Sequence, residues 1–325
     1  MGKMARFCSS RRFGVEIELN TTSGIVRDLG DGESPEGAHD VARIAYRATR
    51  RPVEIHSWHH THNNESWIVK PDRSCGIEIC SPVLKGWVGL ESVMRVVEGL
   101  AAADWPADER CSFHVHVGVD DMSTPEMGGV VGCYIKCEPT FMEAMPRSRR
   151  ANRYCQCIGT SDLIDHALMP SASTLIHRVS TTKYHSLNAY HMRKERRRTV
   201  EFRVGDNSMC LDPYAVKNWL RFLLHFVDVA KELGMPPRHR YGNKWTGLAW
   251  LEPIDVLKML RLDGDLSPGM RQVRDWFVGR LLEGAPDESS PHVWASGARS
   301  HTLEVLRSLL SDPVEKDLYG AKYST

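Results

Sequence analysis

The feature that most constrains the fold of this chain is the strict alternation of apolar and polar side chains that is typical of a β-strand. This pattern occurs four times. Residues 13–19 read FGVEIEL, where four apolar residues alternate with Gly14, Glu16 and Glu18. This period of two predicts a half-buried β-strand with both carboxylates on one face, about 7 Å apart along the strand. The same alternation recurs in GIEIC (76–80), FHVHV (113–117) and TVEFRV (199–204).

If these four strands share a sheet, helices cover the apolar face and the opposite face gathers the polar residues. That polar set is Glu16, Glu18, Glu78, His114, His116, Glu201 and Arg203. Carboxylates gathered in a cleft raise one another's pKa unless cations compensate them. Oxygen-rich ligation with an imidazole suits Mg²⁺ or Mn²⁺ better than zinc. The pattern therefore predicts a divalent metal site on one face of a sheet.

Each pattern also has a simpler explanation when taken alone. Two glutamates on a strand often form the solvated face of an antiparallel sheet. The HxH pair could be two surface histidines or a zinc site, and ExR a weak ion pair on one face. The joint occurrence of all four patterns favours a single site, because converging polar residues are typical of one.

The rest of the chain divides into further elements. Apolar spacing predicts helices over 39–50, 89–103 and 124–145, the last with a threonine cap near its start, and over 214–234. Strands are expected at 67–69 and around 180–190, where the latter would form a β-hairpin with 198–206 across a polar turn. The basic segment 147–154 is expected to be a loop, and the remainder beyond residue 235 mostly helix and loop.

Composition excludes some functions. Among the 325 residues, 42 Lys and Arg nearly balance 41 Asp and Glu, so nucleic acid could bind only locally, for example at RKERRR (193–198). Nine cysteines without a CxxC pair indicate reduced thiols and a cytoplasmic protein. Since no apolar run reaches 18 residues and no leader is evident, we expect no membrane segment. No glycine-rich phosphate loop of the Walker or Rossmann type occurs.

The segments FGVEIEL, DRSCGIEICSPVL, FHVHVG, RRANRYC and TVEFRV occur in this order between residues 13 and 204. In this order they resemble the amidoligases of the carboxylate-amine ligase superfamily, which is related to glutamine synthetase and glutamate-cysteine ligase. The resemblance implies an α+β fold, with a mainly antiparallel curved sheet and helices on one face. It also implies an amidoligase-like catalytic domain, which we place at 1–230. The helical region over 231–325 is expected from its residue pattern alone and is not part of the resemblance.

By the same resemblance, the chain is an ATP-dependent acid-amine ligase that forms an amide or isopeptide bond through an acyl phosphate. The implied metal ligands are Glu16, Glu18, Glu78, His114 and Glu201, and the implied nucleotide contacts are His116, Arg203 and Asn188. The implied catalytic residues are Arg203, Arg149, Arg150 and Glu16, with Arg203 stabilising the transferring phosphoryl group. Asn188 could equally be a simple edge residue.

Several questions stay open at this level. The substrates would be a small-molecule or peptide carboxylate and an amine, and the oligomeric state is undetermined. The rival functions are a zinc hydrolase that uses His114, His116 and a glutamate, and a non-catalytic nucleic-acid-binding relative. Asp72 and Ser74 resemble a DxS motif that recurs in the family before the glutamate strand, for which we expect a structural or substrate-orienting role. The cluster His56, His59, His60 and His62 is interpreted as a polar loop, and Cys133 and Cys137 as core residues.

Overall fold

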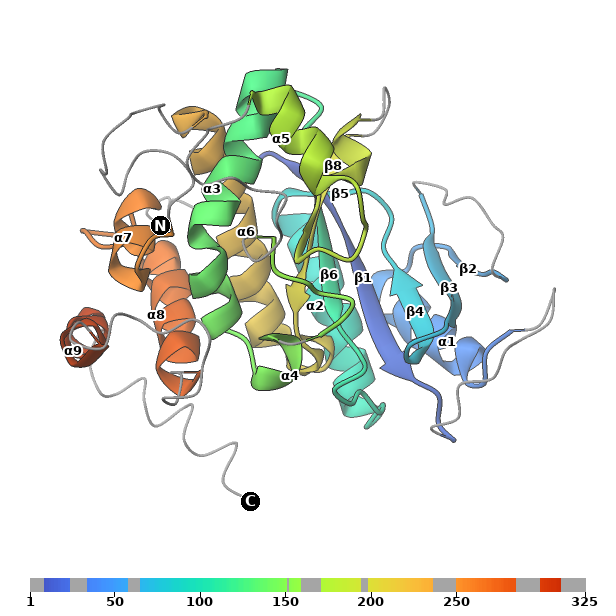
Figure 1. Cartoon of the computed structure of the whole chain (residues 1–325). Coiled ribbons are helices and arrows are strands. Elements are labelled where there is room, and N and C mark those ends of the chain that lie inside the picture. Colours follow the sequence, from blue (N-terminus) through green and yellow to red (C-terminus); the bar gives the residue numbers. More distant parts are fainter. Residues whose placement is uncertain are drawn as a thin grey trace, which may run out of the picture.

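The computed structural model describes residues 9–23, 34–57, 65–150, 152–158, 171–193, 198–235, 250–284 and 299–310. These ranges fold into one sheet with helices packed on its apolar face (Figure 1). Within them, no helix is long and apolar enough to cross a membrane.

The sheet has eight strands in the order β2-β3-β4-β1-β6-β8-β7, with β5 also paired to β1. Only β2 and β3 pair in parallel, and every other pair within the described ranges is antiparallel. The strands are β1 Arg12–Asn20, β2 Val53–Ile55, β3 Trp67–Asp72, β4 Gly76–Cys80, β5 Leu84–Lys85, β6 Phe113–Gly118, β7 Leu187–Asn188 and β8 Thr199–Gly205. The four alternating segments are therefore the adjacent central strands β4, β1, β6 and β8.

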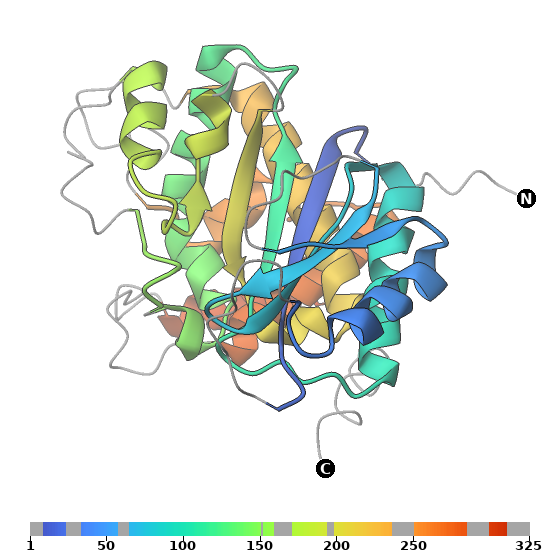
Figure 2. The same ribbon diagram turned by 90° about the vertical axis from the view of Figure 1, so that its right-hand side faces the viewer.

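Helices cover the apolar side of these strands and leave the other side open. Figure 2 looks onto the open face, with α2 and α6 behind the strands. The helices are α1 Ala38–Thr49, α2 Gly86–Ala102, α3 Thr124–Glu143, α4 Arg147–Arg150, α5 Ala172–Val179, α6 Pro213–Leu233, α7 Pro253–Met259, α8 Pro268–Glu283 and α9 Arg299–Leu309, with 3₁₀ turns η1 Tyr190–Arg193 and η2 Asn207–Cys210.

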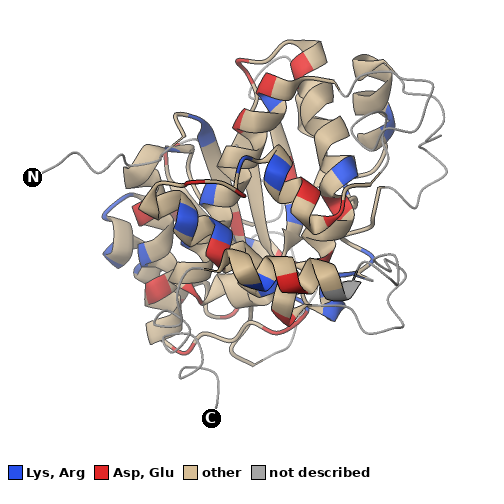
Figure 3. Ribbon diagram, turned by 90° about the vertical axis from the view of Figure 1, so that its left-hand side faces the viewer, with Lys and Arg blue, Asp and Glu red and all other residues tan. Residues whose placement is uncertain are grey.

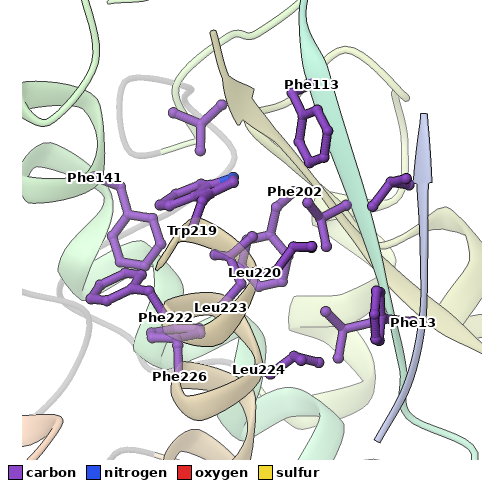
Figure 4. Packing of buried hydrophobic residues seen from close by; sticks show 14 of the residues in the cluster. Phe13, Phe113, Phe141, Phe202, Trp219, Leu220, Phe222, Leu223, Leu224 and Phe226 are labelled. Atoms are coloured by element: carbon purple, nitrogen blue, oxygen red, sulfur yellow. The ribbon is translucent and has the colours of Figure 1, made fainter. Parts of the chain in front are cut away.

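Aromatic side chains fill the space between the sheet and the helices. Figure 4 shows Phe113 and Phe202 of the sheet facing Trp219 and Phe226 of α6. Phe222 of α6 also stacks on Phe277 of α8, with ring centroids 4.1 Å apart. The domain boundary that we placed after residue 230 falls inside α6, which runs to Leu233. Buried residues of α8 belong to the same hydrophobic core as those of the sheet.

The close packing of β6 against β8 depends on a glycine. The register of the two strands shifts between Phe113 and Val115. A Cβ at Gly205 would meet the backbone oxygen of Phe113, so a larger residue there would push the strands apart. This irregularity sets which residues of β8 face those of β6.

Three local predictions were wrong. Segment 147–150 is one helical turn, α4, because Arg149 and Arg150 donate hydrogen bonds to distant backbone carbonyls that hold the turn in place. Only Leu187–Asn188 of the expected 180–190 strand forms a strand paired with β8. Next to it, Ser186 donates to the Gln156 carbonyl while its own carbonyl accepts from Arg203 of β8. The cap of α3 is Ser123, whose hydroxyl and Glu126 form a capping box.

Candidate active site

The strand register brings the predicted acidic and imidazole residues together on the open face. Glu18 lies opposite Glu78 on β4, and Glu16 lies opposite His114 on β6. His116, two residues further along β6, lies opposite Glu201 on β8. Because β4, β1, β6 and β8 are neighbours, these six side chains form one cluster, which we call the acidic cluster.

Glu16 is the centre of this cluster. Its two carboxylate oxygens accept from different rings, Oε2 at 3.1 Å from His114 Nδ1 and Oε1 at 3.1 Å from His116 Nε2. Burial opposes ionisation, but the nearby imidazoles hold the pKa of Glu16 well below its usual range. Burial also disfavours the charged form of His116 and so lowers its pKa. The carboxylates of Glu16 and Glu201 outweigh this effect and raise that pKa to about 9.

Ser112 links Glu18, the second glutamate of β1, to His114. Its hydroxyl donates to Glu18 Oε2 at 2.5 Å and lies 2.8 Å from His114 Nε2. All three side chains are buried, and burial raises the pKa of Glu18 despite the opposing effect of His114. The sequence analysis missed Ser112, although its position two residues before His114 gives it the same strand face.

Glu201 is held by two donors. Arg203 Nη1 lies 2.5 Å from Oε1, and Asn188 Nδ2 donates to Oε2 at 2.6 Å. Burial would raise the pKa of Glu201, but the positive charges of His116 and Arg203 lower it. Arg203 also donates from Nε to the Tyr154 carbonyl at 3.2 Å, which fixes the plane of its guanidinium.

Lys70 was another residue that the sequence analysis missed. It lies opposite Glu78 across β3 and β4, and its ammonium is 2.8 Å from Glu78 Oε2. Burial raises the pKa of Glu78 well above its usual value, with Glu16 adding to the rise and Lys70 opposing it. The alternation of WIVKPD, in which Trp67 and Val69 are core residues, is the signal that places Lys70 on the open face.

The two arginines of α4 lie in different surroundings. Arg149 is buried, donates to the Arg203 carbonyl at 2.5 Å, and lowers the pKa of Glu18 against the larger effect of burial. Its Nε has no hydrogen-bond partner in the part of the chain that the structure describes. Arg150 points elsewhere and donates to the carbonyls of Met142, Glu143, Met145 and Gly284. Of the pair, only Arg149 lies near the acidic cluster.

The acidic cluster fits a divalent cation. Ligand atoms of Glu16, His116 and Glu201 all lie within 4.8 Å of one another. A second group within the same distance consists of Glu16, Glu78 and Cys80, so Glu16 is common to both. Burial raises the pKa of Glu18 and of Glu78, which means that their ionised forms are disfavoured. A bound cation would stabilise those ionised forms.

The remaining candidates lie outside the cluster. Asp72 accepts from the backbone nitrogens of Ser74 and Cys75 and closes the turn before β4. His56 lies 2.8 Å from Glu54. His59, His60, His62 and residues 194–197 lie outside the described residues. Cys133 and Cys137 are buried in the core, as predicted.

Comparison with known proteins identifies the family. A model of amidoligase enzymes matches residues 9–227, which include every strand of the acidic cluster. The chain belongs to this amidoligase family. The match confirms the family that the ordered motifs suggested, and it indicates a ligase of the carboxylate-amine type. No curated protein sequence matches the amidoligase chain.

Two solved structures are similar to this amidoligase at low identity. One, described as a novel glutamine synthase homolog, has 11% identity and a TM-score of 0.43 over 91% of this chain and 71% of its own. The other, a bifunctional glutathione synthetase from Pasteurella multocida, has 11% identity and a TM-score of 0.40 over 92% of this chain. The chain spans about half the length of that synthetase, 49%.

Proposed function

We propose that this amidoligase joins a carboxylate to an amine at the expense of ATP, with Mg²⁺ or Mn²⁺ bound by the acidic cluster. The observation that carries the proposal is the convergence of Glu16, Glu18, Glu78, His114 and Glu201 from four adjacent strands, beside the guanidinium of Arg203. When bound, such a cation would neutralise negative charge on the phosphate oxygens and so favour attack at the γ-phosphorus and departure of ADP.

The reaction would proceed in two steps. An oxygen of the substrate carboxylate attacks the γ-phosphorus of ATP, the bond to the bridging oxygen breaks, and ADP leaves. The amine nitrogen then attacks the acyl carbon, the C–N bond forms, and phosphate leaves with the electrons of the broken C–O bond, while the amine releases a proton. Both steps move negative charge, so they need fixed positive groups more than they need a protein nucleophile.

The chain supplies such groups around the cluster. Arg203 is held by Glu201 and the Tyr154 carbonyl, which presents a rigid fork to phosphate oxygens. Asn188 fixes the second oxygen of Glu201 and so orients that carboxylate. Arg149 supports Arg203 through its carbonyl. The pKa of His116, about 9 in the cation-free protein, suits a protonated contact to a nucleotide phosphate, which would leave Glu16 and Glu201 of its ligand group to the cation.

The test is ADP release from ATP with Mg²⁺ against a panel of acids and amines. Glu16→Gln and Arg203→Ala should each lower turnover at least about 100-fold, because each removes a fixed charge from the reacting centre. Glu98→Gln, at an exposed position on α2, is the matched control and should keep full activity. Retained ligation by Glu16→Gln would refute the metal assignment. Bound zinc together with hydrolysis that needs no nucleotide would support a hydrolase instead.

A further inference from the structure

A thiol borders the acidic cluster, and neither the sequence patterns nor the resemblance gives it a role. Cys80 follows Glu78 by two residues on β4, so both side chains lie on the same strand face. The strand register places Cys80 directly opposite Glu16 of β1. Cys80 is only 4% exposed. The thiol is therefore enclosed beside two carboxylates that the proposed function assigns to Mg²⁺ or Mn²⁺.

The sulfur of Cys80 is close enough to these carboxylates to share a cation with them. Ligand atoms of Glu16, Glu78 and Cys80 all lie within 4.8 Å of one another. Tetrahedral bonds of about 2.3 Å to sulfur and about 2.1 Å to oxygen would place neighbouring ligand atoms about 3.6 Å apart. Small rotations of the side chains close the difference, and water can fill the fourth position. We call these three residues the thiol group.

A positive charge already lies at the thiol group. The ammonium of Lys70 is 2.8 Å from Glu78 Oε2, so the protein itself places a cation against one of the three ligands. A divalent cation would displace this ammonium or bind the other oxygen of Glu78. The positive charge of Lys70 repels all divalent cations alike. Lys70 therefore affects how tightly a cation binds but not which divalent cation is preferred.

The sulfur determines that preference. Mg²⁺ binds oxygen ligands in near-octahedral geometry, whereas a thiolate favours Zn²⁺ and other soft cations. Sites with sulfur and oxygen ligands also bind Zn²⁺ more tightly than Mn²⁺. The thiol releases its proton to solvent when the sulfur binds the metal. The thiol group is thus suited to a cation different from the one that the neighbouring carboxylates alone would select.

Cys80 differs from the other described cysteines in this respect. Among the described residues, it is the one cysteine that belongs to a group of three possible ligands of a metal ion. Cys157 is partly exposed but belongs to no such group. On the helical side of the molecule, Lys and Arg are interspersed with Asp and Glu (Figure 3). A cation that bound weakly on that side would meet oxygen ligands and nearby positive charges.

We propose that Glu16, Glu78 and Cys80 bind Zn²⁺ in preference to Mg²⁺, and that zinc bound there competes with Mg²⁺ for Glu16. Competition follows because Glu16 is common to the thiol group and to the group with His116 and Glu201. The competition rests on the proposed function, which places Mg²⁺ at Glu16, whereas zinc binding does not. Zinc would therefore displace the cation that the ligase uses.

The first test uses Cd²⁺ as a spectroscopic probe of the thiol, without nucleotide. A cadmium–thiolate bond absorbs in the ultraviolet, and a cadmium–carboxylate bond does not. The full chain should gain this absorbance, and Cys80→Ser and Cys80→Ala should each lose the part that corresponds to one thiolate. Cys157→Ser is the matched control and should keep the full absorbance. Circular dichroism checks that the variants are folded.

The second test measures the two affinities by calorimetry. Zn²⁺ and Mg²⁺ are titrated separately, and the ratio of the zinc affinity to the magnesium affinity should fall at least about tenfold in Cys80→Ser. In the wild-type chain, excess Mg²⁺ should weaken zinc binding. This competition needs no variant, so it remains informative if substitution of the buried Cys80 impairs folding.

Unchanged cadmium absorbance in both folded Cys80 variants would overturn the inference. So would a zinc affinity that excess Mg²⁺ leaves unaffected in a chain that binds Mg²⁺. Because ADP release is measured separately, the two proposals fail in different ways. Zinc binding through Cys80 without any ADP release in Mg²⁺ would refute only the ligase proposal. ADP release with an unchanged affinity ratio in Cys80→Ser would refute only the zinc preference.

Discussion

Glu18 on β1 lies directly opposite Glu78 on β4, and each residue is only 6% exposed. Like charges at directly opposed positions of a sheet are unfavourable. Burial raises the pKa of both carboxyl groups, and the charge of Glu16 raises that of Glu78 further. Ionisation of this pair is therefore unfavourable in the cation-free protein, and a divalent cation would relieve that cost.

Divalent cations should accordingly stabilise the protein. At 100 times the dissociation constant, Mg²⁺ or Mn²⁺ should add about 2.7 kcal/mol to the free energy of unfolding and raise Tm by several degrees. Differential scanning fluorimetry measures the shift. Glu78→Gln should lose most of it, while Glu98→Gln should keep it all. An unchanged shift in Glu78→Gln would show that the cation binds elsewhere.

Lys70 should oppose cation binding, since its ammonium lies 2.8 Å from Glu78 Oε2. Lys70→Met keeps most of the apolar stem and removes the charge. We expect the affinity for Mg²⁺ to increase by about tenfold, or 1.4 kcal/mol, because a nearby positive charge no longer repels the cation. Calorimetric titration of Mg²⁺ measures the change, with Lys258→Met on α7 as the control. Weaker binding would indicate that Lys70 organises the site instead.

Arg150 should be important for stability and not for cation binding. It donates to carbonyls at the end of α3 and to Gly284, after α8. Arg150→Ala would leave buried acceptors unpaired, so we expect a loss of about 2–4 kcal/mol in the free energy of unfolding. Chemical denaturation measures the loss, and Arg95→Ala should change stability by less than about 1 kcal/mol. A normal unfolding curve with impaired Mg²⁺ affinity would contradict this role.

The stability of the cation-free protein should fall at alkaline pH through His116. Its pKa, about 9 in the folded chain, exceeds the reference value of 6.5, so protonation favours the native state. This contribution is complete below pH 6.5 and disappears as the pH rises through 9, a difference of about 3 kcal/mol. Denaturation curves at pH 6 and pH 9.5 measure it. In His116→Gln the difference should shrink; a slope equal to that of wild type would assign it to another group.

Much of the candidate site could be predicted from the sequence because strand alternation is a local property. The period of two in FGVEIEL, FHVHV and TVEFRV predicted that the polar side chains of each segment share one face. In β1, β6 and β8 these polar side chains do lie on one face of the strand. The short strands β2 and β5 escaped prediction, since two or three residues carry no periodicity.

Residues outside the alternating motifs could be assigned to the site, or away from it, only from the tertiary structure. Lys70 joined the cluster only because β3 pairs with β4 in a register that sets it against Glu78. Arg149 and Arg150 are neighbours of the same residue type, and only their partners distinguish them. Arg149 donates to the Arg203 carbonyl, and Arg150 donates to carbonyls at the end of α3 and to that of Gly284.

The sequence by itself determined which side chains share a strand face, because backbone geometry alone sends alternate residues to opposite sides. Only the tertiary structure decided which strands are neighbours, which register they adopt and how far apart the charges lie. Those features depend on packing and hydrogen bonds between segments as distant as Glu16 and His114, and no local pattern records them.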